Sequence, residues 1–220
     1  MGMYELKHPN LLFVEDESGT RTVGGDQEWY PRAGYLPGGA CGATTASNQL
    51  AYILRSHPDL FDRARGAGLD GLAGPLTDDA NSKPGYLEFM KKIYAFFHPR
   101  AGGLMVDAFV EGVSALSDEY GLPLKAESLP VTIMRSKRPS KDAVSLFIRE
   151  SLASDIPVAF LILSAGCEKA LENWHWVTIM AYAGEGERAH IIDNGNVIHA
   201  DIGAWLDSSI MGGSFVRLLI

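Results

Sequence analysis

The apolar pattern of this chain changes its period about two-thirds of the way along, and this change constrains the fold most. Up to about residue 155, apolar residues recur at helical spacing. After that point, short runs rich in β-branched and aromatic residues alternate with turn signals. These runs are residues 157–164, 174–184, 188–193, 196–201 and 214–220. Helices followed by strands are typical of an α+β fold with an antiparallel sheet, not of alternating α/β units.

The apolar spacing in the residues before about 155 predicts four helices. The first runs from Cys41 to about His57, because Pro58 disfavours helical backbone at the residue before it. Two more cover residues 86–98 and 104–120, and a fourth follows Ser140, whose side chain suits a helix N-cap. Residues 66–85 are rich in Gly, Asp and Pro and predict a surface loop. Residues 1–40 are polar and turn-rich, with LLFVE as a possible strand.

Two turns organise the predicted sheet. The sequence GEGE at 184–187 joins runs 174–184 and 188–193 as a hairpin. The sequence DNGN at 193–196 is the stronger signal, because Asn-Gly tolerates positive φ. A hairpin brings the end of run 188–193 close to the start of run 174–184.

Cys41 is the candidate nucleophile. It lies where a glycine-rich turn containing Gly38, Gly39 and Gly42 enters the first helix. Backbone N–H groups and the positive end of the helix dipole at such a position favour the thiolate, which is the reactive form of cysteine. The alternative is that Cys41 is only a small buried apolar residue.

His175 is the candidate base. Strand alternation places His175, Val177, Ile179 and Ala181 on one face, from which the histidine could reach a helix packed on the sheet. In the alternative, His175 merely packs between its two tryptophan neighbours.

A base histidine needs a partner on its other ring nitrogen. The predicted hairpin puts Asp193 beside His175, and a carboxylate would both orient the imidazole and stabilise its charged form. Asn194 remains an alternative orienter. The DNGN sequence would also make a good turn without any catalytic role.

Composition narrows the classes of function. The chain has 220 residues, a formal net charge of −8 and 46% hydrophobic residues, which argues against a general nucleic-acid binder. This length suits a single domain over 1–220, with a helical lobe at about 41–155 and a β lobe at about 156–220. We expect no membrane association, because no apolar run is long enough to cross a bilayer.

The cysteine content favours a cytoplasmic location. There are two cysteines and no recognisable signal peptide, so we expect no disulfide framework. Cys167 is predicted to be a packing residue.

No cofactor or metal is expected. Gly66, Gly68 and Gly71 spell GxGxxG, but neither a preceding strand nor a following helix accompanies them. The chain has no GxxxxGK[ST] sequence and no Cys or His spacing typical of zinc.

The stretches CGATTASNQL at Cys41, HWVTIMAY at His175 and IIDNGN at Asp193 together resemble the papain-like cysteine peptidases. The similarity is greatest to the branch of bacteriocin-processing peptidases that remove double-glycine leaders. This resemblance implies an α+β fold in which the nucleophile helix packs on an antiparallel sheet. It also implies a thiolate–imidazolium pair, a thioester acyl-enzyme, and a peptide or small amide as substrate.

One position departs from that family. Papain-like enzymes carry a glutamine for the oxyanion hole six residues before the cysteine, and Tyr35 stands there in this chain. The nearest upstream glutamine is Gln27, which we expect to join the Cys41 backbone N–H in binding the oxyanion. Alternatively, Gln27 is a solvated loop residue beside Trp29. We call Cys41, His175 and Asp193 the triad. Two alternatives to a peptidase therefore stay open, namely an acyltransferase that uses the same triad and a catalytically inactive peptide-binding module.

Overall fold

The computed structural model describes residues 2–36, 39–66, 71–76, 81–98, 102–184 and 186–220. Its centre is a seven-stranded sheet in the order β5-β10-β6-β7-β8-β9, with β1 also paired to β7. All its pairings are antiparallel. The strands are β1 (Met3–Glu5), β5 (Lys125–Val131), β6 (Val158–Ile162), β7 (His175–Ala183), β8 (Arg188–Asp193), β9 (Asn196–Asp201) and β10 (Gly213–Leu219).

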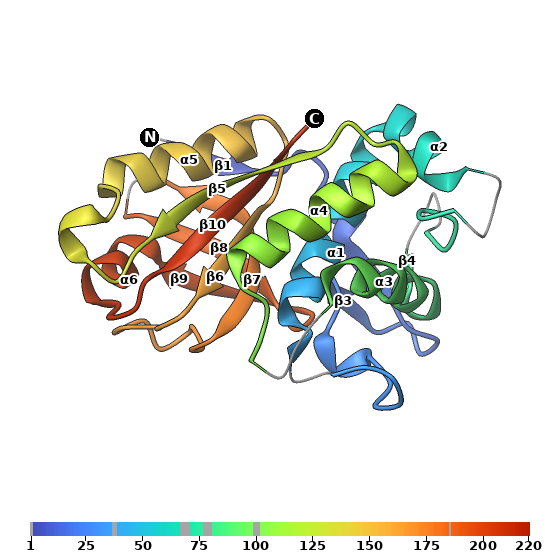
Figure 1. Cartoon of the computed structure of the whole chain (residues 1–220), viewed down its shortest axis with the longest axis horizontal. Helices are drawn as coiled ribbons and strands as arrows, with labels where there is room; N and C mark the ends of the chain where they lie inside the picture. The colour runs from blue at the N-terminus through green and yellow to red at the C-terminus, as the bar shows by residue number, and fades with distance from the viewer. Residues whose placement is uncertain (1, 37–38, 67–70, 77–80, 99–101, 185) are drawn as a thin grey trace.

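Helices cover both faces of this sheet, so the molecule is an α+β protein. On one face lie α1 (Cys41–Ser56), α3 (Lys83–Phe97) and α4 (Val106–Tyr120), which share a core with Trp176, Leu161 and Val216. The opposite face packs against α5 (Lys141–Ala153) and α6 (Ile202–Ser208) through Phe160 and Phe215. Figure 1 shows the two helix groups at opposite sides of the molecule.

Smaller elements surround this core. The helix α2 (Pro58–Arg65) follows α1 directly. A second sheet has the order β3-β2-β4. Its strands are β2 (Phe13–Glu15), β3 (Arg21–Val23) and β4 (Asn81–Ser82), and the 3-10 turns are η1 (Pro9–Leu12), η2 (Gln27–Trp29) and η4 (Arg135–Lys137).

The four predicted helices are confirmed. The first begins at Cys41 and ends at Ser56, and the following His57 is extended, as the proline after it requires. Ser140 caps α5 by accepting a hydrogen bond from the Ala143 N–H. The DNGN turn is confirmed as well, since Asn194 and Gly195 have φ values of 45° and 76°.

The sheet is not confined to the last third of the chain, as the periodicity suggested. β5 lies far upstream but pairs along its whole length with β10. Most of its side chains are exposed, so it carries little apolar pattern, and its place comes from backbone hydrogen bonds at the edge of the sheet. The sequence analysis also missed β1, α2 and α6.

The predicted loop at 66–85 is only partly correct. Residues 67–70 and 77–80 lie outside the described residues, as does residue 185 of the GEGE turn. Asn81 and Ser82 form β4, which pairs in parallel with β2, and α3 begins at Lys83. The Ser82 side chain caps that helix by accepting from the Gly85 N–H.

A bulge in β7 changes which residues share a face. Thr178 pairs with Ile192 and Ala181 with His190, so the register shifts between Ile179 and Ala181. Directly paired residues point to the same side of a sheet, so Ala181 lies on the face of Thr178. The prediction that Ala181 shares the face of His175 is therefore wrong.

Candidate active site

Cys41 is the first residue of α1. The N-cap residue, Ala40, has no side chain that could accept a hydrogen bond from the first turn of the helix. The first N–H groups of a helix have no partner within the helix, so here they can bind a negative group. Cys41 is free and 6% exposed. Gly38 of the preceding turn lies outside the described residues.

Gly42 is required by close packing beside the nucleophile. A Cβ atom at this position would stand 2.7 Å from Leu104 Cδ2 and 3.2 Å from Trp176 Cδ1. The Trp176 indole N–H donates to the Leu104 carbonyl over 2.7 Å, and its ring stacks on Phe109 with centroids 4.6 Å apart. The residue after Cys41 is thus held against a rigid aromatic wall. The sequence analysis missed Leu104, since no local pattern distinguishes it from other apolar residues.

His175 is the first residue of β7 and is 5% exposed. Its Nε2 atom lies 2.7 Å from Asp193 Oδ1, the last residue of β8. The Cys41 side chain lies close enough to the imidazole to contribute to the shift of its pKa. The structure therefore brings together three residues that the sequence analysis singled out.

The environment of His175 favours its protonated form. Burial lowers the pKa of the imidazole, but hydrogen bonds with Asp193 and Cys41, and the negative charge of both partners, raise it. Together these effects raise the pKa of His175 to about 10. The surroundings therefore favour the imidazolium form of His175.

The way His175 reaches the nucleophile differs from the sequence expectation. α1 packs on the other face of β7, where Asn48 donates to Thr178 Oγ1 over 3.4 Å and Gly42 adjoins Trp176. Alternation assigns His175 to the face of Val177 and Ile179, away from this helix. The contact with Cys41 forms where the first residue of the strand meets the first residue of the helix.

Asp193, not Asn194, meets the imidazole. The Asn194 carbonyl accepts a hydrogen bond from the Asn196 side chain, and its positive φ serves the turn. Asp193 pairs with Asn196 at the end of the hairpin, which fixes the position of its carboxylate.

Gln27 begins η2, in a segment tied to α1 on both sides. Before it, the Gly25 N–H donates to Asn48 Oδ1 over 2.9 Å. After it, the buried Tyr30 hydroxyl interacts with Ser47 and donates to the Met90 carbonyl over 3.1 Å. Gln27 is half-buried, and its Oε1 atom is buried without a hydrogen-bond partner among the described residues. Its amide oxygen is therefore turned into the protein with hydrogen-bonding capacity left.

The segment that precedes Gln27 also contacts the turn that follows Asp193. The Val23 N–H donates to the Gly195 carbonyl over 2.9 Å, two residues after Asp193. Asn48 of α1 holds the same segment at Gly25, and its Oδ1 atom also accepts a hydrogen bond from the Tyr86 hydroxyl over 2.9 Å. The sequence analysis missed Asn48, although a polar amide on the apolar face of a helix is the signal that could have found it.

Tyr35 has a packing role. Its ring stacks on Tyr30 with centroids 5.4 Å apart and meets Tyr94 edge-on at 4.8 Å. This aromatic cluster holds the loop that leads to Cys41. The position that carries glutamine in papain-like enzymes is thus filled here by a partly buried aromatic side chain that packs against the core.

A cavity of about 450 Å³ lies between α3 and α4, and none of its lining residues belongs to the triad. Leu104 lines it and also touches Gly42, so one side chain separates the cavity from the nucleophile turn. Phe97 and Ala108 supply apolar walls, and Asp107 and Glu111 add carboxylates. The recess therefore offers both apolar and acidic surface.

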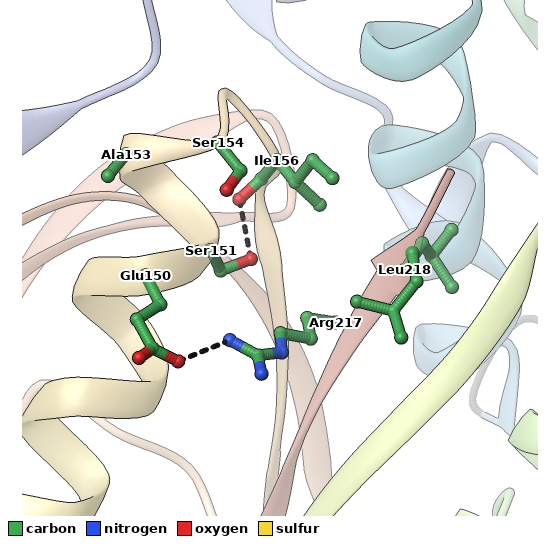
Figure 2. Close-up of a pocket in the computed structure, with 8 residues that line it drawn as sticks. Glu150, Ser151, Ala153, Ser154, Ile156, Arg217 and Leu218 are labelled. Atoms are coloured by element: carbon green, nitrogen blue, oxygen red, sulfur yellow. Dashed lines mark hydrogen bonds and ion pairs between the residues drawn. The ribbon is translucent and has the colours of Figure 1, made fainter.

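A second cavity, of about 430 Å³, lies between α5 and β10 (Figure 2). Figure 2 shows its Arg217 directed at Glu150, and these residues form an ion pair of 3.1 Å. The Ser151 hydroxyl donates to the Ile156 carbonyl over 2.9 Å. Its polar groups are thus paired with one another, and none of its lining residues belongs to the triad.

Cys167 is exposed, which corrects the prediction that it packs in the core. Its thiol lies 3.8 Å from the Ala204 carbonyl. Both cysteines are free, so the molecule offers one buried and one exposed thiol for comparison.

In the described residues, no group of three or more His, Cys, Asp and Glu side chains could hold a metal ion. None of the helices that the structure describes is long and apolar enough to cross a membrane. Neither the protein-family models nor the curated proteins include a match to this chain.

Proposed function

We propose that this protein is a cysteine hydrolase of papain-like fold that cleaves a peptide or small amide bond. The observation that carries the proposal is the position of His175 between the Cys41 thiol and the Asp193 carboxylate. A nucleophile, a base within reach and an orienting group define the arrangement needed for covalent acyl transfer.

In the first half of the reaction, the Cys41 thiolate attacks the substrate carbonyl carbon. The carbonyl electrons move onto oxygen and then return, expelling the amine. The His175 imidazolium donates its proton to that leaving nitrogen, so the amine departs neutral and a thioester remains on Cys41.

In the second half, water attacks the thioester. The now neutral His175 takes a proton from the water, and Cys41 leaves as the thiolate. The carboxylic acid product departs, and the ion pair is restored. Asp193 holds the imidazole by its Nε2 atom throughout, which leaves the other nitrogen for the thiol and the leaving group.

The oxyanion formed at each attack needs donors. The uncapped first turn of α1 supplies backbone N–H groups, including that of Cys41. Gln27, anchored beside α1, would add its side-chain amide. The two free cysteines suit a reducing compartment such as the cytoplasm.

The exposed Cys167 makes a direct test possible. We expect iodoacetamide to alkylate the buried Cys41 at pH 6 faster than Cys167, because an imidazolium beside the thiol favours the thiolate. Peptide mass spectrometry over a time course measures both rates in the same molecule. His175→Ala should remove the advantage of Cys41 and leave the rate of Cys167 unchanged.

The outcome that contradicts the proposal is clear. If Cys167 reacts faster, and His175→Ala changes neither rate, the three side chains do not form a catalytic unit. A turnover assay with a pool of fluorogenic peptide amides should then also show no difference between the parent and Cys41→Ala.

A second reaction, acyl transfer to an amine, is favoured by the burial of the site. Cys41 and His175 are 6% and 5% exposed, which restricts access of water to the thioester. Adding hydroxylamine to the turnover assay separates the two reactions. Hydroxamate forming in preference to acid would identify a transferase, and acid forming in preference would identify a hydrolase.

A further inference from the structure

The end of the central sheet at which His175 lies continues across three further strands. Residue pairing sets His175 of β7 beside Ile162 of β6. Ile162 pairs with Gly213 of β10, which in turn pairs with Val131 of β5. Neighbouring strands lie about 4.8 Å apart, so this row extends roughly 14 Å from His175 to the sheet edge.

Exposed apolar side chains follow this row. Trp174, directly before His175, is 56% exposed and has φ 57°, an unfavourable value for a tryptophan. Ile210, before β10, is 70% exposed, and Ile133 and Met134, after β5, are 64% and 53% exposed. We call these four residues, with Arg135 and Lys137, the sheet-end surface.

Hydrogen bonds show that these segments are neighbours. The Arg138 guanidinium donates to the carbonyls of Thr132 and Ile210 over 2.7 and 3.0 Å. The Ile210 N–H donates to Ser164 Oγ over 3.4 Å, at the start of the loop 163–174 that leads to Trp174. The exposed apolar side chains thus stand on loops that are joined to one another at one end of the sheet, and exposed apolar side chains gathered in this way indicate an interaction site.

The outer part of the surface is basic, although the chain as a whole carries a net charge of −8. Residues 135–141 contain two Arg and two Lys and no acidic residue. Three of these also bond within the protein. Arg138 donates to the carbonyls of the neighbouring loops, Lys141 pairs with Asp207 at 2.6 Å, and Arg135 donates to the Asp207 carbonyl over 2.9 Å. Arg135 and Lys137 are exposed, and the Lys137 ammonium has no ion pair within the described residues.

We infer that the sheet-end surface binds a segment of a polypeptide substrate that carries apolar and acidic side chains. The segment lies on the leaving side of the scissile bond, because His175 protonates the leaving amine and the surface continues outward from His175. A distance of about 14 Å corresponds to roughly four residues of extended chain. This inference rests on the proposed function, and it gives the substrate class as a polypeptide rather than a small amide.

Binding can be measured apart from turnover in a Cys41→Ala variant. The probe is a fluorescein-labelled peptide of five Leu-Glu-Ser triplets, and its counterpart has Lys in place of Glu. By fluorescence anisotropy we expect the acidic peptide to bind at least tenfold more tightly, with an affinity that falls as salt is added. The double variant Ile133→Ser, Ile210→Ser and the single variant Trp174→Ala should each weaken binding about tenfold.

Three controls test whether the loss of binding is specific to the sheet-end surface and whether the variants are folded. Leu146→Ser changes an equally exposed apolar residue, 51% exposed on α5, and should leave binding unchanged. Melting temperatures of all variants check that they are folded. Wild-type protein alkylated at Cys41 should bind the acidic peptide as well as Cys41→Ala does, since an adduct there occupies the acyl side only.

Several results would overturn the inference. These are equal affinity for the two peptides, no binding of either, or no effect of the surface variants. Dimerisation that the double variant abolishes would show that a second copy covers the surface instead. Peptide binding by a protein that turns over no amide would contradict the proposed function while leaving the surface assignment intact.

Discussion

At the scale of single residues, the protonation of His175 affects the stability of the fold. Its pKa is raised to about 10 in the folded protein, against about 6.5 for a histidine in an unfolded chain. A raised folded pKa means that the stabilisation is fully present below pH 6.5 and is lost as the pH rises towards 10. The charged imidazole therefore stabilises the fold at neutral pH.

We expect the free energy of unfolding to fall between pH 6.5 and pH 10 in the wild type, by on the order of 2 to 4 kcal/mol. His175→Gln should show a flatter dependence over the same range, because it lacks the titrating group. Urea unfolding followed by tryptophan fluorescence at several pH values measures both. If the free energy of unfolding changed with pH by the same amount in both proteins, His175 would not be held as the cation.

At the scale of elements, the segment between β3 and α1 depends on one buried amide. Asn48 accepts from the Gly25 N–H and the Tyr86 hydroxyl and donates to Thr178. It thereby joins this segment, α3 and β7 to the middle of the nucleophile helix. The closest contact is at Gly24, where a Cβ atom would stand 2.6 Å from Asn48 Oδ1.

Asn48→Ala should lower the free energy of unfolding by about 2 to 3 kcal/mol, because it leaves buried donors without partners. If the segment also positions Gln27, the kcat for an amide substrate should fall. The fall should be larger than the smaller fraction of folded protein accounts for. Urea unfolding and steady-state kinetics give the two values. Asn10→Ala, at an exposed position in η1, is the matched control and should change neither.

At the scale of the whole molecule, a buried carboxylate joins the N-terminus to both helix layers. Asp155 accepts from the Tyr52 hydroxyl of α1 over 2.5 Å and from the Lys7 N–H over 2.8 Å. It lies between α5 and β6 and is 7% exposed. Segments from three parts of the chain therefore meet at one side chain, far in sequence from the triad.

Tyr52→Phe should cost about 1 to 2 kcal/mol of unfolding free energy, because it leaves the buried Asp155 with one fewer donor. Tyr120→Phe removes a hydroxyl from a half-buried ring and is the matched control. Chemical unfolding measures both. Equal stability of the two variants would show that the Tyr52 hydroxyl contributes nothing to the fold.

The sequence by itself determined the local structure. The first residue of the nucleophile helix, the Ser140 cap and the Asn-Gly turn after Asp193 follow from capping, proline and turn chemistry within a few residues. The hairpin geometry brought Asp193 to His175 for the same reason. These features are predictable because the interactions that decide them lie close together in the chain.

Only the tertiary structure decided how these parts meet. The choice of sheet face for α1, the bulge before Ala181 and the edge position of β5 depend on backbone hydrogen bonds between distant segments, which leave little trace in apolar periodicity. The same holds for Gln27, which Gly25 and Tyr30 anchor beside α1, and for Tyr35, which joins an aromatic cluster. Such contacts form only when the whole core packs, so composition and spacing alone do not predict them.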